Sequence, residues 1–236
     1  VNLLKLRETL LNGTFHTSKY DVFTIYEPKE REIYRLPYFP DRILHHAIMN
    51  VLEPIWVSTF TADTYSCIKN RGIHAAAKKV KQALREDPEG TTFCLKLDIR
   101  KFYPSINHDV LKSILRRKLK DKRLLRLLDE IIDSADGVPI GNYLSQYFAN
   151  LYLTYFDHWI KEQKRVKHYF RYADDIVILA SDKSYLHSLM GEIRAYLGDL
   201  KLEVKGNWQV FPVAARGIDF VGYVFFHTHT RMRKGI

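Results

Sequence analysis

Two adjacent aspartates, Asp174 and Asp175, lie between two short runs of residues that favour β-strands. The first run covers residues 169–172 (Tyr-Phe-Arg-Tyr) and the second covers residues 176–179 (Ile-Val-Ile-Leu). This pattern predicts a β-hairpin with both carboxylates at its tip. Two like charges at such short range repel and raise each other's pKa, so a cation is needed nearby. Because Asp is common in turns, the dipeptide alone also fits an ordinary turn.

A third carboxylate, Asp98, ends another predicted strand at residues 93–98. Apolar residues occupy every second position from Phe93, which places Asp98 on the face opposite the buried row. Three carboxylates on two sheet elements suit hard divalent cations, because these ions prefer oxygen ligands. Two such ions about 3.5–4 Å apart stabilise the attacking and leaving oxygens of a phosphoryl displacement.

The composition narrows the class of partner. A formal net charge of +10 and a pI near 9.4 favour a polyanion such as nucleic acid, although a basic protein without that partner has the same charge. The two cysteines form no Cys-x-x-Cys pair, so neither a zinc site nor a disulfide framework is indicated. No apolar run approaches the roughly 20 residues that cross a bilayer. We therefore expect a cytoplasmic protein without a membrane partner.

The remaining segments predict a mixture of helices and strands. The chain to about residue 92 has mostly helical spacing of its apolar residues. Residues from about 108 to 133 predict one helix, very basic at residues 116–120. Another helix should begin near Gly141, with the amides of Asn142, Gln146 and Asn150 in a row that faces a groove. The absence of a regular βαβ alternation predicts an α+β fold with an antiparallel sheet.

Four segments together resemble the reverse transcriptase family. Residues 170–175 (Phe-Arg-Tyr-Ala-Asp-Asp) resemble its Tyr-x-Asp-Asp signature, and residues 97–106 resemble its first aspartate motif. Residues 141–146 (Gly-Asn-Tyr-Leu-Ser-Gln) resemble the Gly-x-x-x-Ser element, and residues 220–223 (Phe-Val-Gly-Tyr) resemble the primer-grip segment. Their order and spacing fit the family over about residues 34–223, and no single motif would be enough.

The resemblance implies a right-hand polymerase with helical fingers and an antiparallel-sheet palm. It assigns residues 1–92 to the fingers and residues 93–205 to the palm, with a helical insert at about 108–135. Residues 206–236 would be the primer-grip segment and the palm–thumb junction. Because the chain stops soon after that segment, we expect the helical thumb of the family to be truncated or absent.

The resemblance also implies an RNA-directed DNA polymerase that adds deoxynucleotides to a primer 3′ end by a two-metal mechanism. Two Mg²⁺ ions, with Mn²⁺ as a substitute, would bind Asp98, Asp174 and Asp175 and the carbonyl of Ile99. The proton donor to pyrophosphate stays unassigned, with Lys205 and Lys201 as candidates. The implied partners are a template RNA, a DNA primer, deoxynucleoside triphosphates and a small basic accessory protein.

Further residues take roles by the same resemblance. Tyr103 would be the steric gate that excludes the 2′-hydroxyl of a ribonucleotide, with a core aromatic as the alternative because one of Phe102 and Tyr103 must be buried. The nucleotide-binding residues would be Arg35, Arg42, Lys101, Phe102, Tyr103, Ile140, Gly141 and Gln146. The nucleic-acid-binding residues would be Lys69, Arg71, Tyr172, Gly222 and Tyr223. For Arg35 and Arg42, a surface or ion-pair role is nearly as well supported as a phosphate clamp.

Ile140 and Gln146 separate this chain from two branches of the family. Group II intron and retroviral enzymes usually have Gln before the Gly-x-x-x-Ser element, and the intron type has Pro after its Ser. The pattern here resembles enzymes of diversity-generating retroelements, which copy a template RNA with frequent errors at adenines. We hypothesise that an apolar residue in place of the amide removes hydrogen bonds that discriminate against wrong base pairs.

Two alternatives remain open. The first is a group II intron-like, retron or phage-defence reverse transcriptase, encoded like the leading candidate by a bacterium or phage. The second is a catalytically silent RNA-binding relative with the same fold. The three intact aspartates argue against the second alternative, because without a metal they would leave unbalanced charge for no benefit.

Overall fold

The structure is a computed structural model that describes residues 2–26 and 30–234. The chain forms two compact units, each built from two segments: residues 1–59 with 103–152, and residues 60–102 with 153–236. This division differs from the predicted boundaries at residues 92 and 205. Residues 60–92 belong with the sheet of the second unit because they provide a strand and a helix that pack there. No helix in the described part of the chain is long and apolar enough to cross a membrane.

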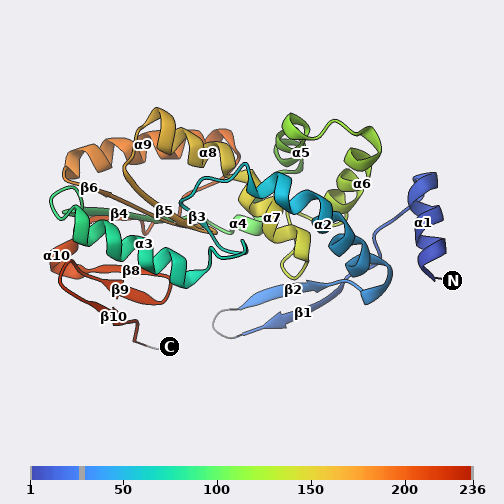
Figure 1. Ribbon diagram of the computed structural model, residues 1–236, viewed down its shortest axis with the longest axis horizontal. Helices are drawn as coiled ribbons and strands as arrows, with labels where there is room; N and C mark the ends of the chain where they lie inside the picture. Colours follow the sequence, from blue (N-terminus) through green and yellow to red (C-terminus); the bar gives the residue numbers. More distant parts are fainter. Residues whose placement is uncertain (1, 27–29, 235–236) are drawn as a thin grey trace. The chain divides into compact units, whose positions relative to one another are not determined.

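The first unit is mainly helical (Figure 1). Its helices are α1 (Asn2–Asn12), α2 (Ile43–Val57), α5 (His108–Lys118), α6 (Lys122–Asp133) and α7 (Tyr143–Tyr152), with a π-helical turn at Tyr38–Arg42. Helix α2 buries Leu44, Ile48 and Leu52 as their helical spacing predicts, and it packs against α7. The ring centroids of Trp56 on α2 and Phe148 on α7 lie 5.8 Å apart. Aromatic packing between these two helices therefore forms part of the core of this unit.

The predicted helix over residues 108–133 is in fact two helices. Helix α5 ends at Lys118, and α6 begins after Asp121, whose side chain accepts hydrogen bonds from the backbone N–H groups of Arg123 and Leu124. Such an N-cap satisfies backbone donors that a helix start leaves without partners, so it fixes where α6 begins. Leu119, in the connection, is buried and anchors the bend.

The mostly helical N-terminal region also contains a β-hairpin, which the sequence analysis missed. Strands β1 (Asp21–Ile25) and β2 (Arg31–Arg35) pair antiparallel, with Phe23 opposite Ile33. Most residues of β1 and the ends of β2 are exposed, so no strong alternation of buried and polar residues marks them in the sequence. Backbone pairing and cross-strand contacts stabilise this hairpin more than burial does.

The predicted amide row on α7 is wrong for two of its three members. Asn142 and Asn150 are buried, and only Gln146 is exposed. Asn142 donates a 3.2 Å hydrogen bond to the hydroxyl of Tyr20. Packing surrounds α7 on most sides, so polar residues at helical spacing here are satisfied inside the unit rather than aligned along a groove.

The second unit contains a five-stranded sheet with the strand order β3-β5-β6-β4-β7. The strands are β3 (Thr64–Tyr65), β4 (Phe93–Asp98), β5 (His168–Tyr172), β6 (Asp175–Ala180) and β7 (Gln209–Pro212). All neighbours pair antiparallel except β3 and β5, which are parallel. A three-stranded sheet of β8 (Ile218–Phe220), β9 (Tyr223–Phe225) and β10 (Thr230–Met232) follows. The structure confirms the predicted α+β class with antiparallel sheets.

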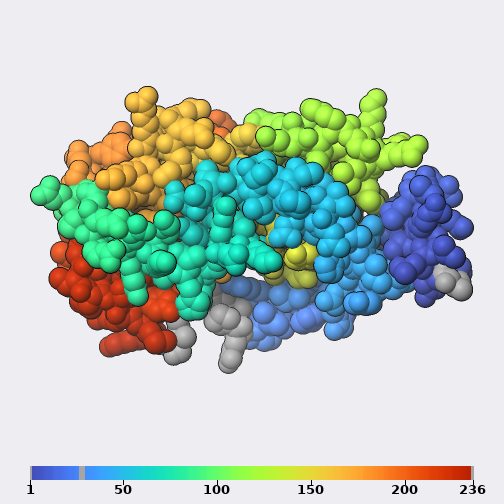
Figure 2. Space-filling view, viewed as in Figure 1, coloured from blue at the N-terminus to red at the C-terminus, as the bar shows by residue number. Residues whose placement is uncertain are grey.

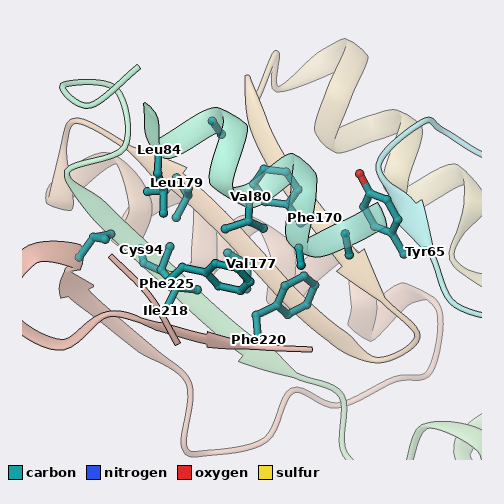
Figure 3. Close-up of a cluster of buried hydrophobic side chains, with 14 of the residues drawn as sticks. Tyr65, Val80, Leu84, Cys94, Phe170, Val177, Leu179, Ile218, Phe220 and Phe225 are labelled. Atoms are coloured by element: carbon teal, nitrogen blue, oxygen red, sulfur yellow. The ribbon is translucent and has the colours of Figure 1, made fainter. Parts of the chain in front are cut away.

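Helices cover the larger sheet. They are α3 (Ile73–Glu86), α8 (Thr154–His158), α9 (Lys183–Asp199) and α10 (Val213–Arg216), with a π-helical turn at Trp159–Gln163, while α4 (Phe102–Ser105) lies where the chain passes between the units. One buried cluster joins α3 and β8–β9 to one face of the sheet, with Val80, Cys94 and Phe220 among its members (Figure 3). Helix α9 packs on β4, β6 and β7. Strand β4 is therefore covered on both faces, and Cys94 is buried although the alternation predicted an open face.

A buried ion pair lies under the β5–β6 hairpin. Arg171 and Asp157 are both 0% exposed, and the guanidinium donates to the two carboxylate oxygens from Nε at 2.8 Å and Nη2 at 2.6 Å. The same carboxylate accepts hydrogen bonds from the hydroxyls of Tyr169 and Thr64. A third donor of Arg171, Nη1, bonds to the carbonyl of Ala173 at 3.0 Å. The pair thus connects β3, α8 and β5 to the tip of the hairpin.

We predict that Arg171→Met destabilises the protein by about 3–5 kcal/mol, because it leaves the buried charge of Asp157 without a partner. Urea unfolding should show this loss. The double substitution Arg171→Met with Asp157→Leu should lose less, because no buried charge remains. Arg100→Met is the matched control, since Arg100 forms an exposed pair with Glu203 worth about 0–1 kcal/mol. A loss at Arg171 no larger than in this control would contradict the prediction.

Candidate active site

The pairing of β4 with β6 brings two of the predicted aspartates together. Asp98 and Asp175 are direct partners across these antiparallel strands, so their side chains project from the same face of the sheet. Asp174 lies in the short connection between β5 and β6, one residue earlier. The backbone N–H of Ile99 donates a 3.3 Å hydrogen bond to the carbonyl of Asp174, which ties the end of β4 to the hairpin tip. All three aspartates therefore lie at one end of one sheet.

The hairpin tip has a backbone conformation that restricts its sequence. Ala173 has a φ of +54°, a left-handed conformation that bulky or β-branched residues rarely adopt. The small side chain at this position is compatible with that turn, and the guanidinium of Arg171 holds its carbonyl. Two contacts therefore fix the position of Asp174. The buried guanidinium of Arg171 bonds to the carbonyl of Ala173, and the backbone N–H of Ile99 bonds to the carbonyl of Asp174 itself.

Two lysines neutralise part of the acidic charge. Nζ of Lys96 lies 2.7 and 2.9 Å from the two carboxylate oxygens of Asp175. Nζ of Lys205 lies 2.5 Å from Oδ1 of Asp98, and the Lys205 backbone N–H donates to the Asp98 carbonyl at 2.9 Å. The sequence analysis considered Lys205 but missed Lys96. The period of two in a strand could have found Lys96, because it lies two residues before Asp98 on the same face.

The surroundings disfavour the charged form of the hairpin aspartates. Burial raises the pKa of Asp174, and the negative charge of Asp98 raises it further. Burial also raises the pKa of Asp175, whereas the ammonium group of Lys96 opposes that shift. The site therefore holds carboxylates whose ionised state needs positive charge close by.

The residues fit a hard divalent cation in their chemistry, although their present contacts are with lysines. No group of three or more His, Cys, Asp or Glu side chains among the described residues is arranged to hold a metal ion. The donor set nevertheless consists of carboxylates, which Mg²⁺ prefers. Oδ1 of Asp98 is buried and accepts no hydrogen bond from any described residue, although it is in the ion pair with Lys205.

The two lysines are only partly buried. The side chains of Lys96 and Lys205 are 26% and 36% exposed. Because both side chains reach solvent, a divalent ion could take their place on the carboxylates and supply the positive charge that these need. To the three predicted aspartates the structure adds two lysines that contact them, Lys96 and Lys205.

The predicted primer-grip segment lies beside this site. Val221 and Gly222 have φ values of +45° and +86° and form the tight turn between β8 and β9. Phe220, at the end of β8, has its ring 5.4 Å from Nζ of Lys96. Because Lys96 also binds Asp175, one side chain connects β8 to the aspartates. Nζ of Lys81 on α3 lies 5.8 Å from the ring of Tyr223.

The predicted nucleotide-binding residues are divided between the units. Lys101 and Phe102 follow β4 in the second unit, and the other six lie in the first. Lys101 is exposed, whereas Phe102 is buried and leaves only its backbone for a nucleotide contact. Tyr103 is half-buried, so the expectation that one of this aromatic pair is buried is confirmed, and Phe102 is that one.

Within the first unit, Ile140 and Gly141 lie against the β1–β2 hairpin. The carbonyl of Ile140 accepts a 2.8 Å hydrogen bond from the backbone N–H of Tyr34. Gly141 has a φ of +120°, and a Cβ there would lie 2.8 Å from the carbonyl oxygen of Tyr34. Only glycine tolerates both the positive φ and the close contact with Tyr34, which explains why glycine begins the Gly-x-x-x-Ser element here. Gln146, on the first turns of α7, is exposed.

The basic candidates differ in their contacts. Arg35 forms an ion pair with Asp21 and lies over the ring of Phe23, which agrees with the ion-pair alternative. Arg42 is exposed. Arg71 donates to the carbonyl of Thr61 at 2.8 Å, a contact that shapes its own loop, and Lys69 on that loop is exposed. Arg35, Arg42 and Lys69 are therefore all exposed, and Arg35 is held by its ion pair with Asp21.

Comparisons with known proteins identify relatives of this chain. A family model described as reverse transcriptase (RNA-dependent DNA polymerase) matches residues 27–225. The chain is 26% identical to Protein YkfC of Escherichia coli (strain K12), over 98% of this chain and 73% of that protein. It is 23% identical to the group II intron-encoded protein LtrA of Lactococcus lactis subsp. cremoris, over 68% of this chain and 28% of LtrA.

A similarity to solved structures supports the fold. The apo telomerase of Candida tropicalis, truncated from its C-terminal domain, has a TM-score of 0.70 and 11% identity, with 98% of this chain and 60% of that chain covered. At such low identity the similarity concerns the fold alone. The chain thus spans most of YkfC but only a part of LtrA and of the telomerase.

We predict that Asp174→Asn raises the melting temperature at neutral pH in buffer with EDTA, by about 2–4 °C. The pKa of Asp174 is raised in the folded protein, so the wild type loses stability as the pH rises through that folded pKa and the carboxyl ionises. Asn cannot ionise and avoids this loss. The stability advantage of the variant should therefore shrink as the pH falls below the folded pKa of Asp174. Asp109→Asn, an exposed control, should show no such gain. A lower melting temperature of the Asp174 variant at neutral pH would contradict this account.

Proposed function

Because this chain belongs to the reverse transcriptase (RNA-dependent DNA polymerase) family, we propose that it extends the 3′ end of a DNA primer along an RNA template. Its substrates are deoxynucleoside triphosphates. The main support is the position of Asp98, Asp174 and Asp175 at one end of the sheet, beside the turn that follows β8. Carboxylates so close together have a clear use in holding divalent cations and no evident structural one.

The proposed roles follow from the side chains present. Asp98, Asp174 and Asp175, with the carbonyl of Ile99, would hold two Mg²⁺ ions, for which Mn²⁺ could substitute. When bound, such ions would supply positive charge to the attacking oxygen and the leaving group. The primer 3′-hydroxyl gives up its proton to water, its oxygen bonds to the α-phosphorus, and the bond from that phosphorus to pyrophosphate breaks. Lys205, next to Asp98, is a better placed proton donor to pyrophosphate than Lys201, which is exposed just after α9.

The remaining predicted residues would bind the primer, the template and the incoming nucleotide. We assign the primer end to Tyr172, Gly222 and Tyr223, because the turn at Gly222 follows Phe220 beside Lys96. Exposed Lys69 and Arg42 suit contacts with template phosphate and triphosphate. Tyr103 suits the role of steric gate, since it is the less buried member of its aromatic pair.

The branch within the family is a finer proposal. Ile140 and Gln146 favour an error-prone, adenine-mutagenic enzyme of a diversity-generating retroelement, which would work with a small basic accessory protein. A group II intron-like enzyme is the second candidate, because LtrA and the nuclear intron maturase 4 of Arabidopsis thaliana are similar to this chain. The side chain of residue 140 is the feature that distinguishes them.

We predict that the purified protein extends a DNA primer on an RNA template when Mg²⁺ is present and that EDTA abolishes the extension. Asp174→Asn should reduce extension to background, because the site loses a charged metal ligand. Asp109→Asn, exposed on α5, should extend as the wild type does. Equal extension by the wild type and Asp174→Asn, or none by the wild type, would count against the proposal.

A second prediction concerns the sugar of the nucleotide. Tyr103→Ala should allow ribonucleoside triphosphates to be added, because the ring that excludes the 2′-hydroxyl is gone. The measurement is the ratio of extension with deoxynucleotides to extension with ribonucleotides, which should fall by at least about tenfold. An unchanged ratio with active enzyme would show that Tyr103 is a core aromatic rather than a gate.

A third prediction concerns fidelity. Ile140→Gln should lower misincorporation at template adenines, because an amide can form hydrogen bonds that discriminate against wrong pairs. Sequencing of products made on a defined RNA template measures this directly. Ile140→Leu is the control and should leave the error rate unchanged. If both variants misincorporate at adenines as often as the wild type does, residue 140 does not set fidelity.

A further inference from the structure

The connection between α5 and α6 is the most strongly charged surface segment of the first unit. Residues 116–126 include seven Lys or Arg residues and one acid, Asp121, for a formal net charge of +6. We call these seven side chains the α5–α6 corner: Arg116, Arg117, Lys118, Lys120, Lys122, Arg123 and Arg126. All seven are exposed, and Figure 2 shows this green segment at the surface.

Little of this charge is neutralised within the unit. Arg116 forms an ion pair with Asp129, with Nη1 lying 3.1 Å from Oδ1. Within residues 2–26 and 30–234, no acidic side chain pairs with Lys118, Lys122, Arg123 or Arg126. Asp121 is the N-cap of α6, where the backbone N–H of Leu124 lowers its pKa most and the charges of Arg123 and Arg126 lower it further. These four cations therefore form no direct ion pair within the described residues and can bind an external anion, while Asp121 offsets part of the charge of Arg123 and Arg126.

Helix stability explains only half of the corner. Arg116, Arg117 and Lys118 lie in the last turn of α5, where the negative end of the helix dipole favours cations. Lys122 and Arg123 lie in the first turn of α6, where the positive end of the dipole disfavours them, and the acid at that helix start is the N-cap Asp121 rather than a residue of the first turn. Each such placement costs a fraction of 1 kcal/mol. Exposed cations that oppose the helix dipole lower the stability of the helix, so their presence at the start of α6 indicates a functional reason for the charge.

The composition of the corner favours nucleic acid, rather than a membrane surface, as its binding partner. Membrane-surface helices pair their cations with large exposed apolar residues that enter the lipid. None of the large exposed apolar residues in the described part of the chain lies between residues 108 and 133. The corner thus offers charge without an inserting face, which fits a sugar–phosphate backbone.

We propose that the α5–α6 corner binds the phosphate backbone of a folded RNA stem, in the part of the template transcript that is not being copied. This inference rests on the proposed function, which supplies RNA as the partner. Lys118, Lys122, Arg123 and Arg126 contact the phosphates from two helix ends that meet at Leu119. Recognition of duplex RNA by shape and backbone needs no base contacts, so this site does not read sequence.

The test replaces these four cations with Gln in the full chain and measures binding to an RNA hairpin at several salt concentrations. Wild-type affinity should fall steeply with salt, and the slope of log K against log salt should be smaller by about 3–4 in the variant. At physiological salt the variant should bind about ten- to a hundredfold more weakly. Extension of a short, unstructured primer–template should be unchanged, because the corner does not take part in the reaction.

A matched control has Lys5, Lys78, Lys79 and Lys183 replaced with Gln. These four are also exposed, and the net charge changes equally. The control should keep most of the wild-type affinity and slope. Melting temperatures report folding, and the corner variant should melt at or above the wild type, because it loses cations at the start of α6.

Three results would overturn the inference. The first is hairpin binding with wild-type affinity and slope by the corner variant. The second is an equal loss of affinity in corner and control variants, which would show that only net charge matters. The third is loss of extension on the short primer–template by the corner variant, which would show that the charges serve polymerisation instead. A wild type that binds the hairpin through the corner but extends no primer would reject the proposed function and leave the RNA surface intact.

Discussion

The mutual repulsion of three carboxylates at one end of a sheet is the constraint on which the rest of the structure depends. Pairing of β4 with β6 places Asp98 directly opposite Asp175, and the hairpin turn places Asp174 next to them. Burial adds to the cost of ionising Asp174 and Asp175. Lys96 and Lys205 relieve the repulsion. Their long, partly exposed side chains allow another cation to take their place on the carboxylates.

Such a site needs a rigid support, and the second unit provides it from two sides. Beneath the hairpin, the buried pair of Arg171 and Asp157 fixes the carbonyl of Ala173. On the sheet face, the cluster shared by α3 and β8–β9 holds the strands that end in the aspartates. A buried ion pair seldom adds net stability over an apolar replacement. Here the ion pair instead fixes the position of the β5–β6 turn, which the repulsion between its aspartates would otherwise displace.

The α5–α6 corner and the aspartate cluster are two cases of one principle. In both, the sequence places charges where local electrostatics disfavours them: acids close together in one site, cations at the start of α6 in the other. Proteins tolerate such placements where an external ion of opposite sign completes the arrangement. Divalent cations would do this for the aspartates, and phosphate groups would do so for the corner. The stability lost in the free protein is then recovered on binding.

The sequence by itself determined the β-hairpin with two aspartates, the strand that ends at Asp98 and the α+β class, because short-range periodicity and turn chemistry encode these features. It also showed the motifs of the family, whereas the need for glycine at residue 141 follows from the close approach of Tyr34 in the folded chain. Only the tertiary structure decided which side chains balance the acids, since Lys96 and Lys205 reach them through strand pairing and a loop return. It also buried Asn142 and Asn150, divided the basic helix at Asp121 and paired β1 with β2. The periodicity of apolar residues identifies the face of a helix or strand that is buried. What packs against its other faces is decided by contacts between residues far apart in the chain.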